Sequence, residues 1–105
     1  LMFSKFLLGE INVPDSVTEI LGRSPLDLIA RHAVCEFGVI SPRQHKLNLQ
    51  ALELADEIVS EYRVDPIKDD LGRIRIVTRP GWGSTDVMWI KPQPKPKRRS
   101  DVVPF

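Results

Sequence analysis

The chain has 105 residues, 42% of them hydrophobic and 28% charged, with a formal net charge of +1 at pH 7. This length suits one domain with a modest core, and the single cysteine excludes an internal disulfide framework. No apolar run approaches the ~18 residues of a membrane-spanning helix. We therefore expect an intracellular, cytoplasmic protein that contacts no membrane, with a nuclear location left open.

Charge is distributed unevenly along the chain. Residues 1–70 carry seven Lys and Arg against twelve Asp and Glu, whereas residues 71–105 carry eight against two. A basic end of this kind is expected to bind a polyanion, or the acidic part of a second copy or of another protein.

The N-terminal half predicts a short strand and two helices. Residues 10–13 alternate in polarity and allow a strand. Helices are predicted over residues 16–21, with Gly22 as a left-handed stop, and over residues 25–37, before Gly38. The expected inner face of the second helix comprises Leu26, Ile29, Ala30, Ala33, Val34 and Phe37. Because Leu28 and Cys35 lie on its other side, we expect this helix also to contact the N-terminal segment or a second subunit.

The longest helical pattern follows Ser41. Ser41 and Pro42 are typical of a helix start, and apolar residues at helical spacing predict a helix over residues 42–63, or over 49–63 behind a short turn. The predicted core stripe of this helix comprises Leu47, Ala51, Leu54, Ala55, Ile58 and Tyr62.

A β-hairpin is predicted next. Residues 73–79 alternate in period two, residues 80–85 are rich in turn formers, and residues 86–90 can return as the antiparallel partner. The side chains expected to face the core are Ile74, Ile76 and Trp89. The arginines expected on the opposite surface are Arg73, Arg75 and Arg79.

Together these patterns predict an α+β domain over residues 14–90, with three helices followed by a β-hairpin. An N-terminal segment, residues 1–13, precedes it, and residues 91–105 form an extended arm in which proline alternates with lysine and arginine. The order helix, helix, longer helix, hairpin resembles that of winged-helix proteins, whose third helix enters the major groove of DNA. The resemblance covers about residues 14–90 and rests on element order alone.

This resemblance implies a nucleic-acid-binding surface in three parts. At the start of the third helix the contacting residues would be Arg43, Gln44, Lys46 and Asn48. On the hairpin they would be Arg73, Arg75, Arg79 and, at its tip, Trp82, which can stack on a base or fold back onto the core. In the arm they would be Lys95, Lys97, Arg98 and Arg99. Four acids farther along the third helix would restrict its contact with DNA to the N-terminal tip.

We therefore expect a small non-enzymatic protein that binds nucleic acid, with double-stranded DNA as the expected partner and a homodimer as one arrangement. One alternative is a protein-interaction module that uses the basic arm or the C-terminal peptide 102–105. The other is an α+β domain whose sheet arginines are merely solvated. His32 and Cys35 are three residues apart, but no third ligand or orienting acid completes a metal or nucleophile site. No metal, cofactor or catalytic residue is predicted.

Overall fold

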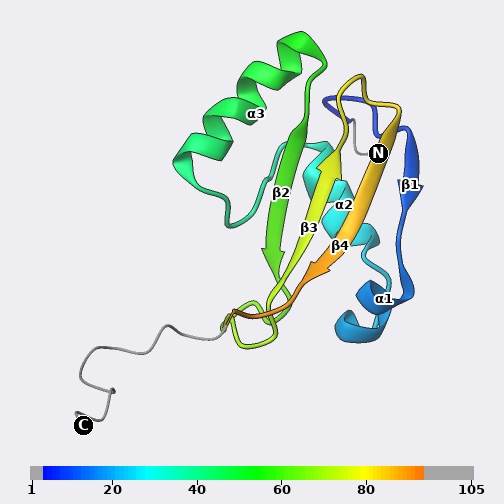
Figure 1. Cartoon of the computed structure of the whole chain (residues 1–105), viewed down its shortest axis with the longest axis vertical. Helices are drawn as coiled ribbons and strands as arrows, with labels where there is room; N and C mark the ends of the chain where they lie inside the picture. Colours follow the sequence, from blue (N-terminus) through cyan, green and yellow to red (C-terminus); the bar gives the residue numbers. More distant parts are fainter. Residues whose placement is uncertain (1–3, 94–105) are drawn as a thin grey trace, which may run out of the picture.

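The computed structural model describes residues 4–93, which fold around one sheet. The strands are β1 (Glu10–Asn12), β2 (Ile58–Arg63), β3 (Arg73–Thr78) and β4 (Ser84–Ile90). The helices are α1 (Asp15–Leu21), α2 (Leu26–Ala33) and α3 (Pro42–Leu54). The sheet has the order β1-β4-β3-β2; β2, β3 and β4 are antiparallel, and β1 runs parallel to β4 (Figure 1).

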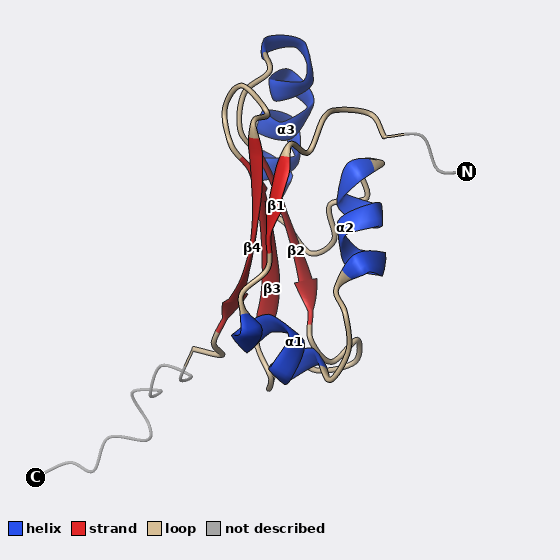
Figure 2. Ribbon diagram, turned by 90° about the vertical axis from the view of Figure 1, so that its right-hand side faces the viewer, coloured by secondary structure: helices blue, strands red, loops and turns tan. Residues whose placement is uncertain are grey.

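The two faces of the sheet have different surroundings. α2 lies behind the strands in Figure 1 and to their right in Figure 2, and α1 lies at the lower end of the sheet. Val17 of α1 packs in the same core cluster as Leu28 and Ile29 of α2, so both helices cover the same face. α3 lies beside β2, at the edge of the sheet. The other face carries none of the described helices, and we call it the open face. The predicted α+β class and the three helices are thus confirmed, whereas the sheet has four strands and extends beyond the predicted hairpin, so the winged-helix order is not confirmed.

The main core lies between the sheet and the two covering helices. Its buried members are Val17, Leu28, Ile29, Tyr62, Ile74, Ile76 and Val87. Since side chains alternate between the faces of a strand, β3 turns Ile74 and Ile76 inward and its arginines outward. Trp89 packs against the same cluster, so the predicted inward residues of the hairpin are confirmed.

A second cluster joins the N-terminal segment to α3 and β2. Its buried residues are Phe6, Phe37, Ala51 and Ile58. The Phe6 ring also packs edge-on against His32 of α2, with 5.2 Å between ring centroids. The N-terminal segment therefore contacts this helix at His32, whereas Leu28, expected on its second face, lies in the main core.

The predicted helix over residues 42–63 is wrong in its second half. α3 ends at Leu54 because Ala55 adopts a left-handed conformation, and residues 58–63 form β2 instead. Ile58, Ser60 and Tyr62 face the core in period two, a pattern that β-branched and aromatic residues favour. Consequently Leu54, predicted as core, is 74% exposed.

The second predicted helix is also too long, because α2 ends at Ala33 and Cys35 adopts a positive φ of 66°. Residues 37–39 then run along the outer edge of β2, where Glu61 donates its backbone N–H to Phe37 and accepts one from Val39. The buried residues of α2 are Leu28, Ile29, His32 and Ala33, whereas Leu26 is 69% exposed. The inner face of this helix is thus rotated from the predicted one.

The strand expected over residues 10–13 and the hairpin are confirmed, the latter as β3 and β4. Between residues 4 and 93, every helix falls short of the length and apolar character of a membrane-crossing segment.

Candidate functional site

The open face of the sheet presents a row of arginines. The side chains of the open face come from alternate residues of β2, β3 and β4: Val59, Glu61, Arg63, Arg73, Arg75, Val77, Asp86, Met88 and Ile90. Arg79 follows β3 directly and lies beside Asp86. The sequence prediction that Arg73, Arg75 and Arg79 share one surface agrees with their positions around a single groove.

This groove has a volume of about 590 Å³ and runs between the open face and the segment that leads into α3. Its lining includes Val39, Gln44, Glu61, Arg73, Arg75 and Arg79. The hairpin thus supplies the guanidinium groups of the groove, and the start of α3 supplies one wall.

Each arginine of the open face has a carboxylate partner. Glu61 lies directly opposite Arg75 in the β2–β3 register and accepts hydrogen bonds from Arg75 Nε at 2.8 Å and Arg73 Nη1 at 3.3 Å. Asp86 accepts from Arg79 Nε at 2.7 Å. Asp69, from the β2–β3 loop, accepts from both Arg73 and Arg63. The guanidinium groups are therefore held in fixed positions, and their charge is partly neutralised.

Two of these pairs, Arg79–Asp86 and Arg73–Asp69, shift pKa values toward the ionised forms. The hydrogen bond from Arg79, helped by Asn12, lowers the pKa of the Asp86 carboxyl group. Arg73 does the same to Asp69, and Asp69 in turn raises the pKa of Arg73. Asp69, Arg73 and Asp86 are consequently ionised at neutral pH.

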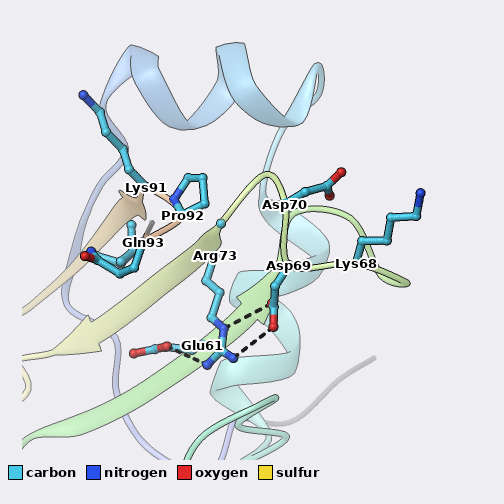
Figure 3. A pocket seen from close by; sticks show the side chains of 10 residues that line it. Glu61, Lys68, Asp69, Asp70, Arg73, Lys91, Pro92 and Gln93 are labelled. Atoms are coloured by element: carbon cyan, nitrogen blue, oxygen red, sulfur yellow. Dashed lines mark hydrogen bonds and ion pairs between the residues drawn. The ribbon is translucent and has the colours of Figure 1, made fainter. Parts of the chain in front are cut away.

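A second hollow, of about 700 Å³, adjoins the first at the end of β4 (Figure 3). Arg73 and Glu61 line both hollows, and Arg73 reaches between Glu61 and Asp69. Lys68 and Lys91 also line it, but their side chains point away from Arg73. Arg73 is thus the central cation of a charged strip that spans the two hollows.

The start of α3 contributes less than its sequence predicts. Ser41 caps the helix by accepting from the Gln44 N–H at 3.0 Å, which leaves Arg43 and Lys46 exposed in the first turns. Asn48 is fully buried, and its side-chain amide bonds to both the N–H and the carbonyl of Val59. Asn48 therefore supplies the hydrogen-bond partners of the β2 backbone at Val59, and its side chain is not accessible to a ligand.

Trp82, at the hairpin tip, folds back onto the body of the protein. Its indole N–H donates to the Asp56 carbonyl at 2.9 Å, and its ring lies 5.6 Å from that of Phe6. Of its two predicted roles, the structure supports packing against the core.

The predicted arm residues Lys95, Lys97, Arg98 and Arg99 lie outside the described residues, as does the peptide 102–105.

The acids that hold the arginines are the residues that the sequence prediction missed. Glu61 is one of the four acids of the predicted helix over residues 42–63, and on the polar face of such a helix it would lie far from the hairpin. Alternation of Ile58, Ser60 and Tyr62 with Glu61 and Arg63 was the available signal, because it places Glu61 on the arginine face of a strand.

Outside the open face, a buried polar chain crosses the helix-covered side of the sheet. His32 Nδ1 lies 2.6 Å from Ser60 Oγ, and His32 Nε2 lies 2.9 Å from Thr78 Oγ1. Thr78 is hydrogen-bonded to Thr85, whose hydroxyl donates to the Leu8 carbonyl. Burial lowers the pKa of His32 to about 4, so the imidazole is neutral at pH 7. Its role is to hydrogen-bond the buried hydroxyl groups of Ser60 and Thr78.

Within residues 4–93, no group of three His, Cys, Asp or Glu side chains is arranged to hold a metal ion. Cys35 is a free thiol whose pKa is raised by burial, which makes it less nucleophilic.

Comparison with protein-family models, with curated proteins and with solved structures finds no match.

Proposed function

We propose that this protein binds nucleic acid and that the open face contacts the phosphate backbone. The observation that supports this proposal best is the row of Arg73, Arg75 and Arg79 around one groove. From Arg73 to Arg79 an extended strand covers about 20 Å, enough for several phosphates in succession. Arginine suits this role because its planar guanidinium group can donate two parallel hydrogen bonds to a phosphate.

A duplex is the better candidate than a single strand. Single-strand binders stack bases on exposed aromatic rings, and the open face between residues 4 and 93 carries none. Tyr62 and Trp89 face the helix-covered side, and Trp82 packs against Phe6. Contacts from arginines to phosphates require no stacking and carry little sequence information, which favours binding with low sequence specificity.

Of the DNA-binding mode of winged-helix proteins, our proposal keeps only the contacts made by the start of α3 and by the β3–β4 hairpin. Arg43 and Lys46 in the first turns of α3 would contact phosphates beside the groove, while the β3–β4 hairpin meets the neighbouring backbone. Glu53 of α3 and Asp56 after it would stay outside the contact, as expected for a helix that approaches by its tip, whereas Glu57 lines the groove. The basic arm would add further backbone contacts, and no second copy of the chain is required.

A protein partner is the second candidate, because the open face is mixed in character. The half-buried side chains of Val77, Met88 and Ile90 lie among its ion pairs, and such a surface can also fit a partner of complementary charge. This candidate predicts binding that depends on the open face without any affinity for nucleic acid.

The test is a charge reversal at Arg75 in the full chain. We expect Arg75→Glu to weaken binding to a fluorescent random-sequence duplex about five- to tenfold at low salt and to reduce the slope of log affinity against log salt by about 1, because one phosphate contact is lost. Fluorescence anisotropy across a salt series measures both quantities.

Arg23→Glu is the matched control. Arg23 also pairs with a carboxylate, that of Asp27, and is comparably exposed, but it lies in the loop after α1. Equal effects of the two reversals would contradict a site on the open face. Absence of binding to duplex DNA, single-stranded DNA and RNA at low salt would contradict the proposed function itself.

A further inference from the structure

Glu61 occupies an unusual position on the open face. Its side chain is 17% exposed, whereas those of Arg73 and Arg75 are 33% and 39% exposed. The carboxylate is therefore less accessible to solvent than the two arginine side chains with which it pairs.

The backbone around Glu61 fixes this arrangement. Its N–H and carbonyl both bond outward, to Phe37 and Val39, and not to β3. Glu61 and Arg75 therefore form a non-hydrogen-bonded pair of the antiparallel ladder, the kind in which side chains approach most closely. Gly38 permits the outward bonds, since a Cβ there would lie 1.9 Å from the Glu61 carbonyl oxygen.

The carboxylate uses the same donors that a phosphate would require. Arg75 Nε and Nη2 both lie close to Glu61 Oε2, and Arg73 Nη1 donates to Glu61 Oε1. An anion that binds Arg75 through its Nε and Nη2 edge, and Arg73 through Nη1, takes these donors from Glu61. Binding at this point of the face is consequently an exchange of one anion for another.

We propose that Glu61 is an internal counter-ion that nucleic acid displaces, and that it restricts the open face to polyanions with adjacent phosphates. An isolated phosphate would only replace one ion pair by another and so gain little. A nucleic-acid backbone engages Arg73, Arg75 and Arg79 together, and the added contacts offset the loss of the internal pairs. This inference rests on the proposed nucleic-acid binding.

Glu61→Gln in the full chain tests it, with Glu57→Gln as the matched control. Both substitutions remove one negative charge from the lining of the same groove, but the ion pairs described there use Glu61 and not Glu57. We expect Glu61→Gln to tighten binding to a random-sequence duplex about three- to tenfold, and Glu57→Gln to change it less than about twofold. We also expect inorganic phosphate to raise the melting temperature of Glu61→Gln more than that of the wild type or of Glu57→Gln.

A second variant keeps the test valid if Glu61→Gln folds poorly. Glu61→Asp retains the charge but draws the carboxylate back by one methylene, so its affinity should lie between those of the wild type and Glu61→Gln. If the wild type binds, Arg75→Glu weakens binding, and Glu61→Gln matches Glu57→Gln, the counter-ion role is overturned while the proposed function stands. If neither the wild type nor Glu61→Gln binds any nucleic acid at low salt, both fail.

Discussion

His32 shows how a single residue is assigned its role by neighbours that are distant in the chain. Both ring nitrogens have hydroxyl partners, Ser60 on β2 and Thr78 on β3, and the side chain is fully buried. The sequence presents the same histidine three residues before Cys35, a spacing that suggests chemistry. In the structure both ring nitrogens are instead hydrogen-bonded within the core, as is usual for a buried polar group.

The stability of the fold should therefore depend on pH above the range in which carboxyl groups titrate. His32 has a pKa of about 4 in the folded state, against about 6.5 in the unfolded state, so the unfolded chain binds a proton first as the pH falls. Stability should decrease as the pH falls below 6.5, and the loss should be complete near pH 4. Between pH 7 and pH 5 we expect the free energy of unfolding to drop by about 2 kcal/mol, as measured by urea denaturation.

His32→Gln is the control for this effect, since it removes the titrating group and leaves His45 in place. A dependence on pH of the same size in that variant, or a flat profile in the wild type, would contradict the role of His32.

The positions of the arginines could be predicted from the sequence, but the identity of their acidic partners could not. The alternation of Arg73, Ile74, Arg75 and Ile76 is sufficient to place two arginines on one face of a strand. Glu61 lies opposite Arg75 because of the β2–β3 register. This register could not be predicted, because the sequence analysis assigns residues 58–63 to a helix.

Between α3 and β2, the sequence satisfies two periodicities at once. Ala51, Ile58 and Tyr62 fall on one stripe of a helix, yet Ile58, Ser60 and Tyr62 also alternate as in a strand. Because Ala55 is no conventional helix stop, the change of period could be missed. The hairpin was predictable since its turn is rich in glycine and proline and both flanking runs alternate.

Asn48 connects these two elements, and its loss should be costly. Asn48→Ala would leave the buried N–H and carbonyl of Val59 without partners, so we expect the free energy of unfolding to fall by about 3 kcal/mol. Gln50→Ala, at an exposed position of the same helix, should stay within about 0.5 kcal/mol of the wild type. Chemical denaturation measures both, and a loss below about 1 kcal/mol for Asn48→Ala would contradict the proposed anchoring of α3.

Across the whole molecule, the two faces of the sheet differ: one face packs in the hydrophobic core, and the other carries the charged side chains. Residues that stabilise the fold gather on the side of the sheet that α2 covers (Figure 2). The arginines and their acids gather on the open face. This separation explains why the sequence could place the arginines on one surface but could not identify their acidic partners. Hydrophobic periodicity indicates which side of a strand is buried, but it does not indicate which charges meet on the other side.

The most direct measurement of the central claim, that the body of the protein and not only its basic arm binds nucleic acid, is anisotropy with two chains. One is the full chain, and the other ends at Gln93 and keeps every described helix and strand. We predict that the shorter chain binds a random-sequence duplex more weakly, but with an affinity that still falls steeply between about 50 and 200 mM salt and that Arg75→Glu reduces further. Complete loss of binding in the shorter chain would contradict a site on the open face.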